Sequence, residues 1–196
     1  MKKTSKNIKR VIIYNFIIIF FICIFSSSQK LYANYPNGNT AGFFLRFSFP
    51  SEISLGMTGK FDSIPFMFSG VFNIGISTKG FAWFGITSSA DWWGLKHRIG
   101  EVGNSIAWIY FGPGVEVDIQ FGNNYWNLGL AFRLPLGVSF IVDRDWEIFL
   151  QIAPGLNVIA IGNEGFSTFG WYPSNTGWSF SKFFRFSGDF GFRYWF

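Results

Sequence analysis

The chain has almost none of the residues on which most enzyme sites depend. Its 196 residues contain one cysteine and one histidine. Cys23 lies in an N-terminal segment that we expect to be removed, so the rest of the chain has no cysteine for a disulfide, a thiol nucleophile or a metal. His97 would have to serve any Ser–His–Asp arrangement, yet it lies in a polar stretch between Lys96 and Arg98, as an ordinary exposed histidine does.

No group of histidines and carboxylates has the spacing of a metal site. Glu116 and Asp118 lie two residues apart and could mimic a catalytic carboxylate pair, but structural ion pairs with Arg133 and its neighbours are the simpler interpretation. Gly112-Pro113-Gly114 lies in a strand pattern, so it predicts a bulge or close packing rather than a phosphate loop. The sequence therefore predicts no cofactor, no metal and no enzyme activity.

Charge is also scarce, and its positive excess is confined to one end. Charged residues make up 14% of the chain, with a formal net charge of +5. Residues 1–33 hold six of the 16 Lys and Arg and none of the 11 Asp and Glu, which leaves ten basic and eleven acidic residues in the remainder. Without the N-terminal segment the net charge is −1, so it does not indicate a nucleic-acid partner.

Residues 1–33 have the order of a secretory signal peptide: basic residues, an apolar run from Val11 to Phe25, then small and polar residues. Cleavage is expected after Ala33 or near Ser28. An uncleaved anchor is the alternative, although fifteen residues are few for a spanning helix of about twenty. Lipidation of Cys23 is disfavoured because large residues precede it. Residues 34–40 are expected to form a leader, and no later apolar run approaches twenty residues.

Aromatic residues and glycine are abundant, and the apolar residues follow a period of two. Phe, Trp and Tyr form 22% of the chain, including 28 Phe. Alternation of apolar and polar residues predicts strands, with Gly, Asn, Asp and Pro at the turns between them. Eight strands are predicted, at about 41–49, 53–61, 66–77, 81–89, 105–121, 125–141, 146–161 and 182–196.

The two faces of these strands differ strongly. One face is aromatic and aliphatic, and the other holds small polar residues with single charges between them. The interior of an eight-stranded barrel is too narrow for a dozen or more aromatic side chains, so we expect the apolar face outside and the charges inside. The expected ladder of paired lumen charges comprises Arg46, Lys60, Glu116, Asp118, Arg133, Glu147, Arg185, Asp189 and Arg193.

These observations predict an all-β fold, a closed antiparallel up-and-down transmembrane β-barrel of eight strands over residues 41–196. Membrane lipid is the expected surrounding and a monomer the expected state. A soluble lipocalin-like barrel with an apolar ligand is the main alternative, and a narrow channel is another. The polar stretch 90–103 is expected to connect two strands on the periplasmic side, where turns are normally short. Either this connection is an exception, or the number of strands differs in the region 80–105.

The chain ends on GDFGFRYWF, residues 188–196. This stretch resembles the C-terminal signal of bacterial outer-membrane barrels, with Phe192, Tyr194 and Phe196 at its alternating aromatic positions. The resemblance implies that the barrel-assembly machinery of the outer membrane is a partner.

A second stretch, Gly129 to Ile159, contains an Arg-x-Pro-x-Gly strand, a short turn and a Glu-x-Phe strand ending at Ala-Pro. The residues of this pattern are Arg133, Pro135, Gly137, Glu147, Phe149, Ala153 and Pro154. With SLGMTGKF it resembles a spirochaete family, of unknown function, of small eight-stranded outer-membrane barrels with OmpA- and OmpX-like architecture. The resemblance implies a bacterial cell outer membrane location and no assigned reaction.

Residues 162–180 form the longest expected connection and carry a group of aromatic residues: Phe166, Phe169, Trp171, Tyr172 and Trp178. Such side chains dominate binding interfaces, which predicts a structural or adhesin-like protein that contacts a host or matrix molecule through this loop. The alternative is that they belong to the aromatic belt at the membrane surface.

Overall fold

The structure is a computed structural model. It describes residues 38–48, 52–77, 80–103, 105–122, 125–142, 145–163, 165–172, 177–178 and 183–196. The expected signal peptide and all but the end of the expected leader lie outside these residues. Among the described residues, helices of the length and apolar character needed to cross a membrane are absent.

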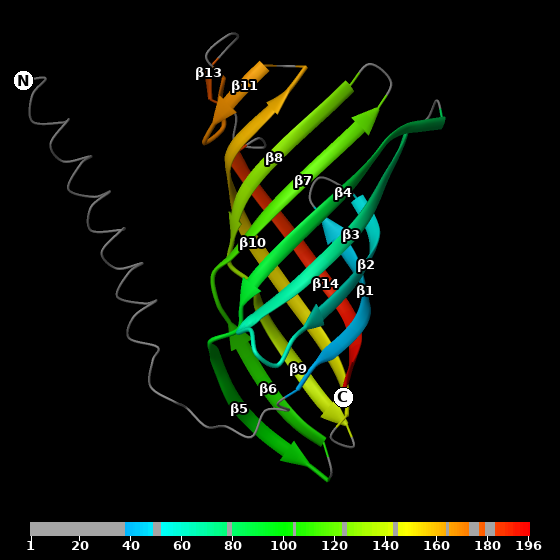
Figure 1. Cartoon of the computed structure of the whole chain (residues 1–196), viewed down its shortest axis with the longest axis vertical. Helices are drawn as coiled ribbons and strands as arrows, with labels where there is room; N and C mark the ends of the chain where they lie inside the picture. Colours follow the sequence, from blue (N-terminus) through cyan, green and yellow to red (C-terminus); the bar gives the residue numbers. More distant parts are fainter. Residues whose placement is uncertain are drawn as a thin grey trace, which may run out of the picture. The chain divides into compact units, whose positions relative to one another are not determined.

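The described chain is an all-β antiparallel sheet (Figure 1). Its strands are β1 (Thr40–Ser48), β2 (Glu52–Lys60), β3 (Phe66–Ser77), β4 (Gly80–Trp92), β5 (Leu95–Val102), β6 (Ser105–Phe111), β7 (Gly114–Gly122), β8 (Tyr125–Arg133), β9 (Leu136–Val142), β10 (Trp146–Gly162), β11 (Gly165–Thr168), β12 (Trp171–Tyr172), β13 (Gly177–Trp178) and β14 (Phe184–Trp195).

Eight of these strands pair in a closed ring. The order is β1, β2, β3, β4, β7, β8, β10 and β14, and β14 pairs again with β1. The last pairing extends over the whole of β1, from Thr40 opposite Trp195 to Ser48 opposite Ser187. Backbone hydrogen bonds between Asn39 and Phe196 continue it by one residue. The C-terminal strand therefore closes the ring against the N-terminal strand.

Three further strands, β5, β6 and β9, continue the lines of β4, β7 and β8 at the end of the ring where Asn39 and Phe196 lie, here called the terminal end. β5 pairs with β6, β6 with β9, and β9 with the first half of β10. Below the ring in Figure 1, the strand order is therefore β5–β6–β9–β10. In this order β5, β6 and β9 take the places that β4, β7 and β8 have in the ring. The expected strands 105–121 and 125–141 are each two strands in line, separated by short breaks.

A row of prolines marks these breaks. Proline has no N–H to donate to a ladder, so it interrupts pairing on one side while its carbonyl still accepts a hydrogen bond. The carbonyls of Pro65, Pro113, Pro135 and Pro154 each accept from the neighbouring strand: from Trp93, Trp92, Gly112 and Leu134, at 2.8–3.2 Å. The proline row runs across the sheet, and the extension begins on its terminal side.

Of the two alternatives for the region 80–105, the structure supports a different number of strands, and the interpretation of 90–103 as a plain connection is wrong. β4 continues to Trp92, and Leu95–Val102 form β5, with the turn at Gly103 in a positive-φ conformation (60°). His97 therefore lies on a strand, with its side chain exposed. Lys96, Arg98 and Glu101 make the stretch polar, and this hides the strand from the alternation of apolar and polar residues. β5 has a single partner strand among the described residues, and its described side chains are half-buried or exposed.

The two faces of the ring are arranged as the alternation predicts. In β1 the side chains of Phe43, Leu45 and Phe47 are 43–50% exposed, while those of Phe44 and Arg46 are buried. The same alternation of exposed apolar and buried polar or small residues runs through β7, β10 and β14. The interior is therefore polar and the outer surface of the ring is hydrophobic.

At the opposite end, here called the far end, β11, β12 and β13 form a small antiparallel ladder that extends from β10. The expected connection 162–180 thus contains strands. Val158 is bulged out of the β10–β8 pairing, and its carbonyl accepts a hydrogen bond from the amide of Phe169 at 3.0 Å. Phe169 adopts a left-handed backbone conformation (φ 48°), which is costly for an aromatic residue and fixes the direction of this segment.

Candidate functional site

The interior of the ring holds a connected cluster of buried ions at mid-height. We call it the central ion cluster: Arg46, Asp91, Glu116, Asp118, Arg133, Arg185 and Asp189. It draws side chains from β1, β4, β7, β8 and β14, so all of these strands must be in register before the cluster can form. Six of its members are buried to 7% exposure or less, and Arg185 is half-buried.

Within this cluster, Arg46 is bonded to Asp189, which lies directly opposite it on β14. Its Nε donates to Oδ1 of Asp189 at 2.7 Å and its Nη2 to Oδ2 at 2.9 Å, a two-pronged arrangement that fits the guanidinium fork. Nη1 donates to Oε2 of Glu116 at 3.1 Å. Arg46 of β1 is thereby bonded both to β14, its neighbour where the ring closes, and to β7 on the opposite wall.

Glu116 connects the three arginines. Its carboxylate receives hydrogen bonds from Arg46 and from Arg133 (2.7 Å) and lies 3.3 Å from Arg185. Arg185 also donates to Asp118. Taking charges out of water costs several kcal/mol each, and this cost is offset only where partners and hydrogen bonds are complete. The number of contacts per ion explains how so many charges can share one interior.

Asp91, a member that the sequence did not identify, lies 3.2 Å from Nε of Arg133 and is 2% exposed. In the sequence it falls within the polar stretch 90–103. The missed signal is that Thr87, Ser89 and Asp91 continue one alternating small polar face to the end of β4.

A second interior group closes the terminal end. This terminal aromatic cluster consists of Met67, Trp93, Trp108, Tyr110, Ile141 and Trp195. Its residues come from β3, β6, β9, β14 and the break after β4, and the rings of Trp93 and Tyr110 lie 4.7 Å apart. Sequence reasoning placed aromatic side chains on the outside and so did not predict this group.

Arg193 and Glu147 lie between the two groups. Arg193 donates to Oε1 of Glu147 at 3.0 Å, and the indole of Trp195 donates to Oε2 at 2.9 Å. The guanidinium lies 3.6 Å from the ring centre of Phe149 and 4.9 Å from that of Trp93, which adds cation–π attraction. Tyr110 and Gln151 continue the hydrogen bonds upward to Asp189, at 3.1 Å for each step. The interior polar network thus runs from the terminal end to mid-height.

The last residue of the expected ladder, Lys60, lies apart. It is half-buried at the end of β2 and donates to the carbonyl of Phe61 at 3.3 Å. Lys96 of β5, which was not assigned to the ladder, lies over the ring of Trp93 at 4.8 Å. Burial, together with the positive charges of Lys60 and Arg193, lowers the pKa of Lys96 to about 8, while Glu147 opposes this shift.

Of the expected assembly-signal residues, Phe192 and Tyr194 lie on the outer face of β14 and Phe196 directly follows the strand; the three side chains are 40–69% exposed. Of the expected binding residues, Phe166 and Phe169 are exposed at the far end, by 49% and 52%. Trp171 and Tyr172 form β12 and Trp178 ends β13, but the side chains of these three residues lie outside the described part of the structure.

The described residues contain no group of three or more His, Cys, Asp or Glu side chains arranged to hold a metal ion. The carboxylates of the central ion cluster form ion pairs with arginine side chains instead. The chemistry that this interior supplies is electrostatic cross-linking of strands.

No family model matches the chain, and no curated protein matches it. Among solved structures, it is similar to the crystal structure of Neisserial surface protein A, with 11% sequence identity, a TM-score of 0.43, and coverage of 81% of this chain and 94% of that one. At this level of similarity, properties of that protein do not transfer to this chain.

Proposed function

We propose that the chain is a non-enzymatic integral β-barrel of the bacterial outer membrane, with the eight-stranded ring crossing the bilayer. One observation carries this proposal: the ring is inverted relative to a water-soluble protein. Its large apolar side chains face outward all around, for example Ile53, Leu55 and Met57 of β2 at 60–68% exposure, while its charged side chains are buried and paired inside.

The strand lengths fit this location. The ring strands have 9 to 17 residues, and a tilted strand needs about 9–11 residues to cross a bilayer. Closure of the ring satisfies the backbone hydrogen bonds that lipid cannot satisfy. A soluble barrel that carries an apolar ligand would need the aromatic face inside, and the observed faces are the reverse of that requirement.

A structural or surface-binding role is favoured over transport. The central ion cluster and the terminal aromatic cluster both occupy the interior, and an eight-stranded barrel has room for little besides its own side chains. The far end, with β11–β13 and the exposed rings of Phe166 and Phe169, is the part that we assign to the cell exterior and to contact with a host or matrix molecule.

Two measurements test the location and the orientation. Unboiled protein should migrate differently from boiled protein in electrophoresis and should resist carbonate extraction; recovery in the soluble fraction would refute the membrane assignment. An epitope inserted between Gly122, where β7 ends, and Tyr125, where β8 begins, should label intact cells because both strand ends lie at the far end. The same epitope inserted between β5 and β6, whose adjoining ends lie at the terminal end, should label only after the outer membrane is opened, and the opposite pattern would invert the proposed topology.

The binding role has its own test. Replacing Trp171 and Tyr172 with serine should abolish adhesion to host cells or matrix proteins without changing the heat-dependent shift in mobility. The matched control replaces Phe61 with serine, an exposed aromatic at the terminal end. If the double variant still adheres, the proposed binding role is wrong and only the structural role remains.

A further inference from the structure

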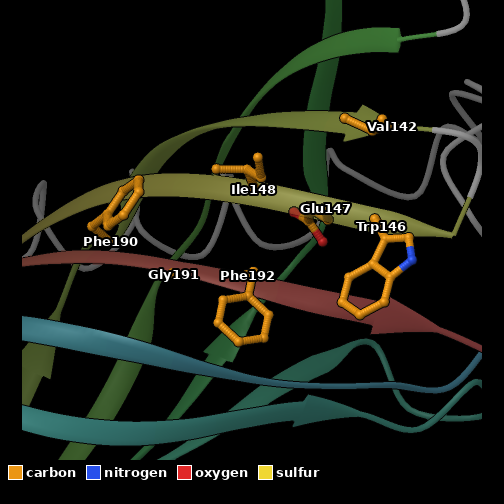
Figure 2. A pocket seen from close by; sticks show the side chains of 7 residues that line it. All are labelled: Val142, Trp146, Glu147, Ile148, Phe190, Gly191 and Phe192. Atoms are coloured by element: carbon orange, nitrogen blue, oxygen red, sulfur yellow. The ribbon is translucent and has the colours of Figure 1, made fainter.

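The outer face of the ring is not uniformly convex: it contains an apolar groove where β9, β10 and β14 run side by side (Figure 2). The groove has a volume of about 430 Å³ and is lined by Val142, Trp146, Glu147, Ile148, Phe190, Gly191 and Phe192. This volume lies in the range of about 300–1,000 Å³ that is typical of ligand sites. We propose that this groove holds the acyl chain of a membrane lipid, a role that rests on the proposed membrane location.

The register of the strands creates the groove. Ile148 of β10 lies opposite Phe192 of β14, and the next outward pair toward the far end contains Phe190. Figure 2 shows Ile148 between Phe190 on one side and Trp146 on the other, with Phe192 on the neighbouring strand. The aliphatic side chains of Val142 and Ile148 are shorter than the three aromatic rings around them, and the groove lies among these five outward residues.

The walls are hydrocarbon and aromatic carbon. Glu147 is among the lining residues, but its carboxylate turns to the interior, where it binds Arg193 and Trp195, and the residue is fully buried. Gly191 contributes backbone only. The groove thus has an apolar lining with nothing to recognise a polar headgroup, and this chemistry selects an alkyl chain.

The walls are also held in place before any ligand arrives. Trp146 packs against Tyr194 with ring centroids 5.0 Å apart and lies 6.4 Å from Phe192, and Phe192 lies 6.1 Å from Phe43 of β1. Such aromatic pairs stabilise the arrangement beyond the burial of their surface. Because these rings are already ordered, binding a chain costs less conformational entropy than it would at a mobile surface.

The size of the groove argues for a lipid over a second copy of the protein. Seven residues line it, whereas a stable protein interface involves about 20–30 residues on each side. The surrounding outer face is exposed apolar surface, so whatever reaches the groove must be soluble in the bilayer. An acyl chain meets both conditions.

Native mass spectrometry of the full chain, extracted from membranes in a mild detergent, tests the proposal. The wild-type protein should retain a bound phospholipid or lipopolysaccharide mass. Val142→Trp and Ile148→Trp, which fill the groove from different strands, should each reduce retention roughly tenfold or more. The control is Ile86→Trp, an outward residue of β4 that is 55% exposed and lies outside the groove; it should retain lipid as the wild type does.

Heat-dependent mobility and membrane fractionation are measured on the same samples. A folded, membrane-inserted protein that retains no lipid, or whose groove-filling variants retain as much as the Ile86→Trp control, overturns the groove proposal and leaves the proposed function intact. Absence from the membrane fraction would instead refute the proposed function. A dimer that Ile148→Trp converts to a monomer would assign the groove to a second copy and would also overturn the proposal.

Discussion

Arg46 and Asp189 are register partners across the β1–β14 pairing, and two hydrogen bonds of 2.7 and 2.9 Å join them inside the ring. They stand at the point where the N-terminal and C-terminal strands meet. The pair therefore reports directly on whether the ring has closed in the correct register, because a slip by one residue would move one of the two charges to the outer face.

We expect Asp189→Leu to destabilise the protein by about 3–5 kcal/mol, because it leaves the guanidinium of Arg46 buried without its main partner. Urea unfolding in lipid vesicles measures the change. Combining it with Arg46→Met should recover a large part of the loss, since no unpaired charge remains at this position. As a control, Arg98→Ala removes an exposed ion pair with Glu101 on β5 and should cost less than about 1 kcal/mol. Equal costs for the buried and the exposed change would contradict the role assigned to the pair.

Leu130 tests which face of the ring meets lipid. Its side chain points outward from β8, opposite Val117. If this position lies near the bilayer centre, Leu130→Arg should cost about 2–4 kcal/mol of folding free energy in vesicles. Phe166→Arg, at an exposed position of β11 beyond the ring, should change stability little. A negligible effect at Leu130 would count against the outward apolar face as a membrane surface.

The proline row gives a prediction about backbone packing. A Cβ added to Gly112 would lie 1.9 Å from the carbonyl oxygen of Trp92, and backbone cannot move aside as a side chain can. Gly112→Ala should therefore destabilise by about 1–3 kcal/mol or more, as overpacked sites do. Gly70→Ala is the matched control, because a Cβ there meets nothing within 4 Å. The difference between the two thermal midpoints, measured in one detergent, is the relevant quantity.

The prolines also show why the sequence predicted part of the fold and not the rest. Alternation is a local signal, so the strands β1, β2, β3, β10 and β14 and their inward and outward faces could be predicted closely. A break at Gly112-Pro113 or Leu134-Pro135 leaves the alternation on both sides unchanged, so each pair of strands in line was predicted as one.

The sequence predicted most of the charged residues of the interior but not its buried aromatic residues. Arg46, Glu116 and Asp189 stand out because charges are rare on an otherwise small polar face. Trp93, Trp108 and Trp195 do not stand out, because aromatic residues occur on both faces and the rule that places them outside fails at the terminal end. They pack together at the terminal end, where β6 and β9 extend the wall of the sheet beyond the proline row.

Lys96 predicts a specific pH dependence. Its pKa is about 8 in the folded protein against 10.5 for an ordinary lysine, so between these values the unfolded chain binds more protons than the folded one. Stability should therefore rise with pH across this window. Lys96→Met should stabilise the protein at pH 7 and should flatten the rise, whereas Arg98→Met, at an exposed position of the same strand, should leave the slope unchanged. Unfolding midpoints from pH 7 to 10.5 provide the comparison, and an unchanged slope in Lys96→Met would show that the lysine is not the group responsible.

Phe196 separates assembly in the cell from stability of the finished fold. Its side chain is 69% exposed, while its backbone completes the ladder with Asn39 whatever the side chain is. Phe196→Ser should therefore change the free energy of unfolding in vesicles by less than about 1 kcal/mol, as surface substitutions generally do. If the assembly machinery recognises the terminal aromatic residue, the same variant should be inserted several times less efficiently when expressed in a Gram-negative host.

Phe61→Ser is the control. It removes a ring of similar exposure (61%) at the same end but outside the C-terminal strand, and it should insert normally. Equal insertion of the two variants would show that Phe196 serves the fold and not its recognition, whereas a matching loss of stability and insertion in Phe196→Ser would make the assembly defect a consequence of weakened folding.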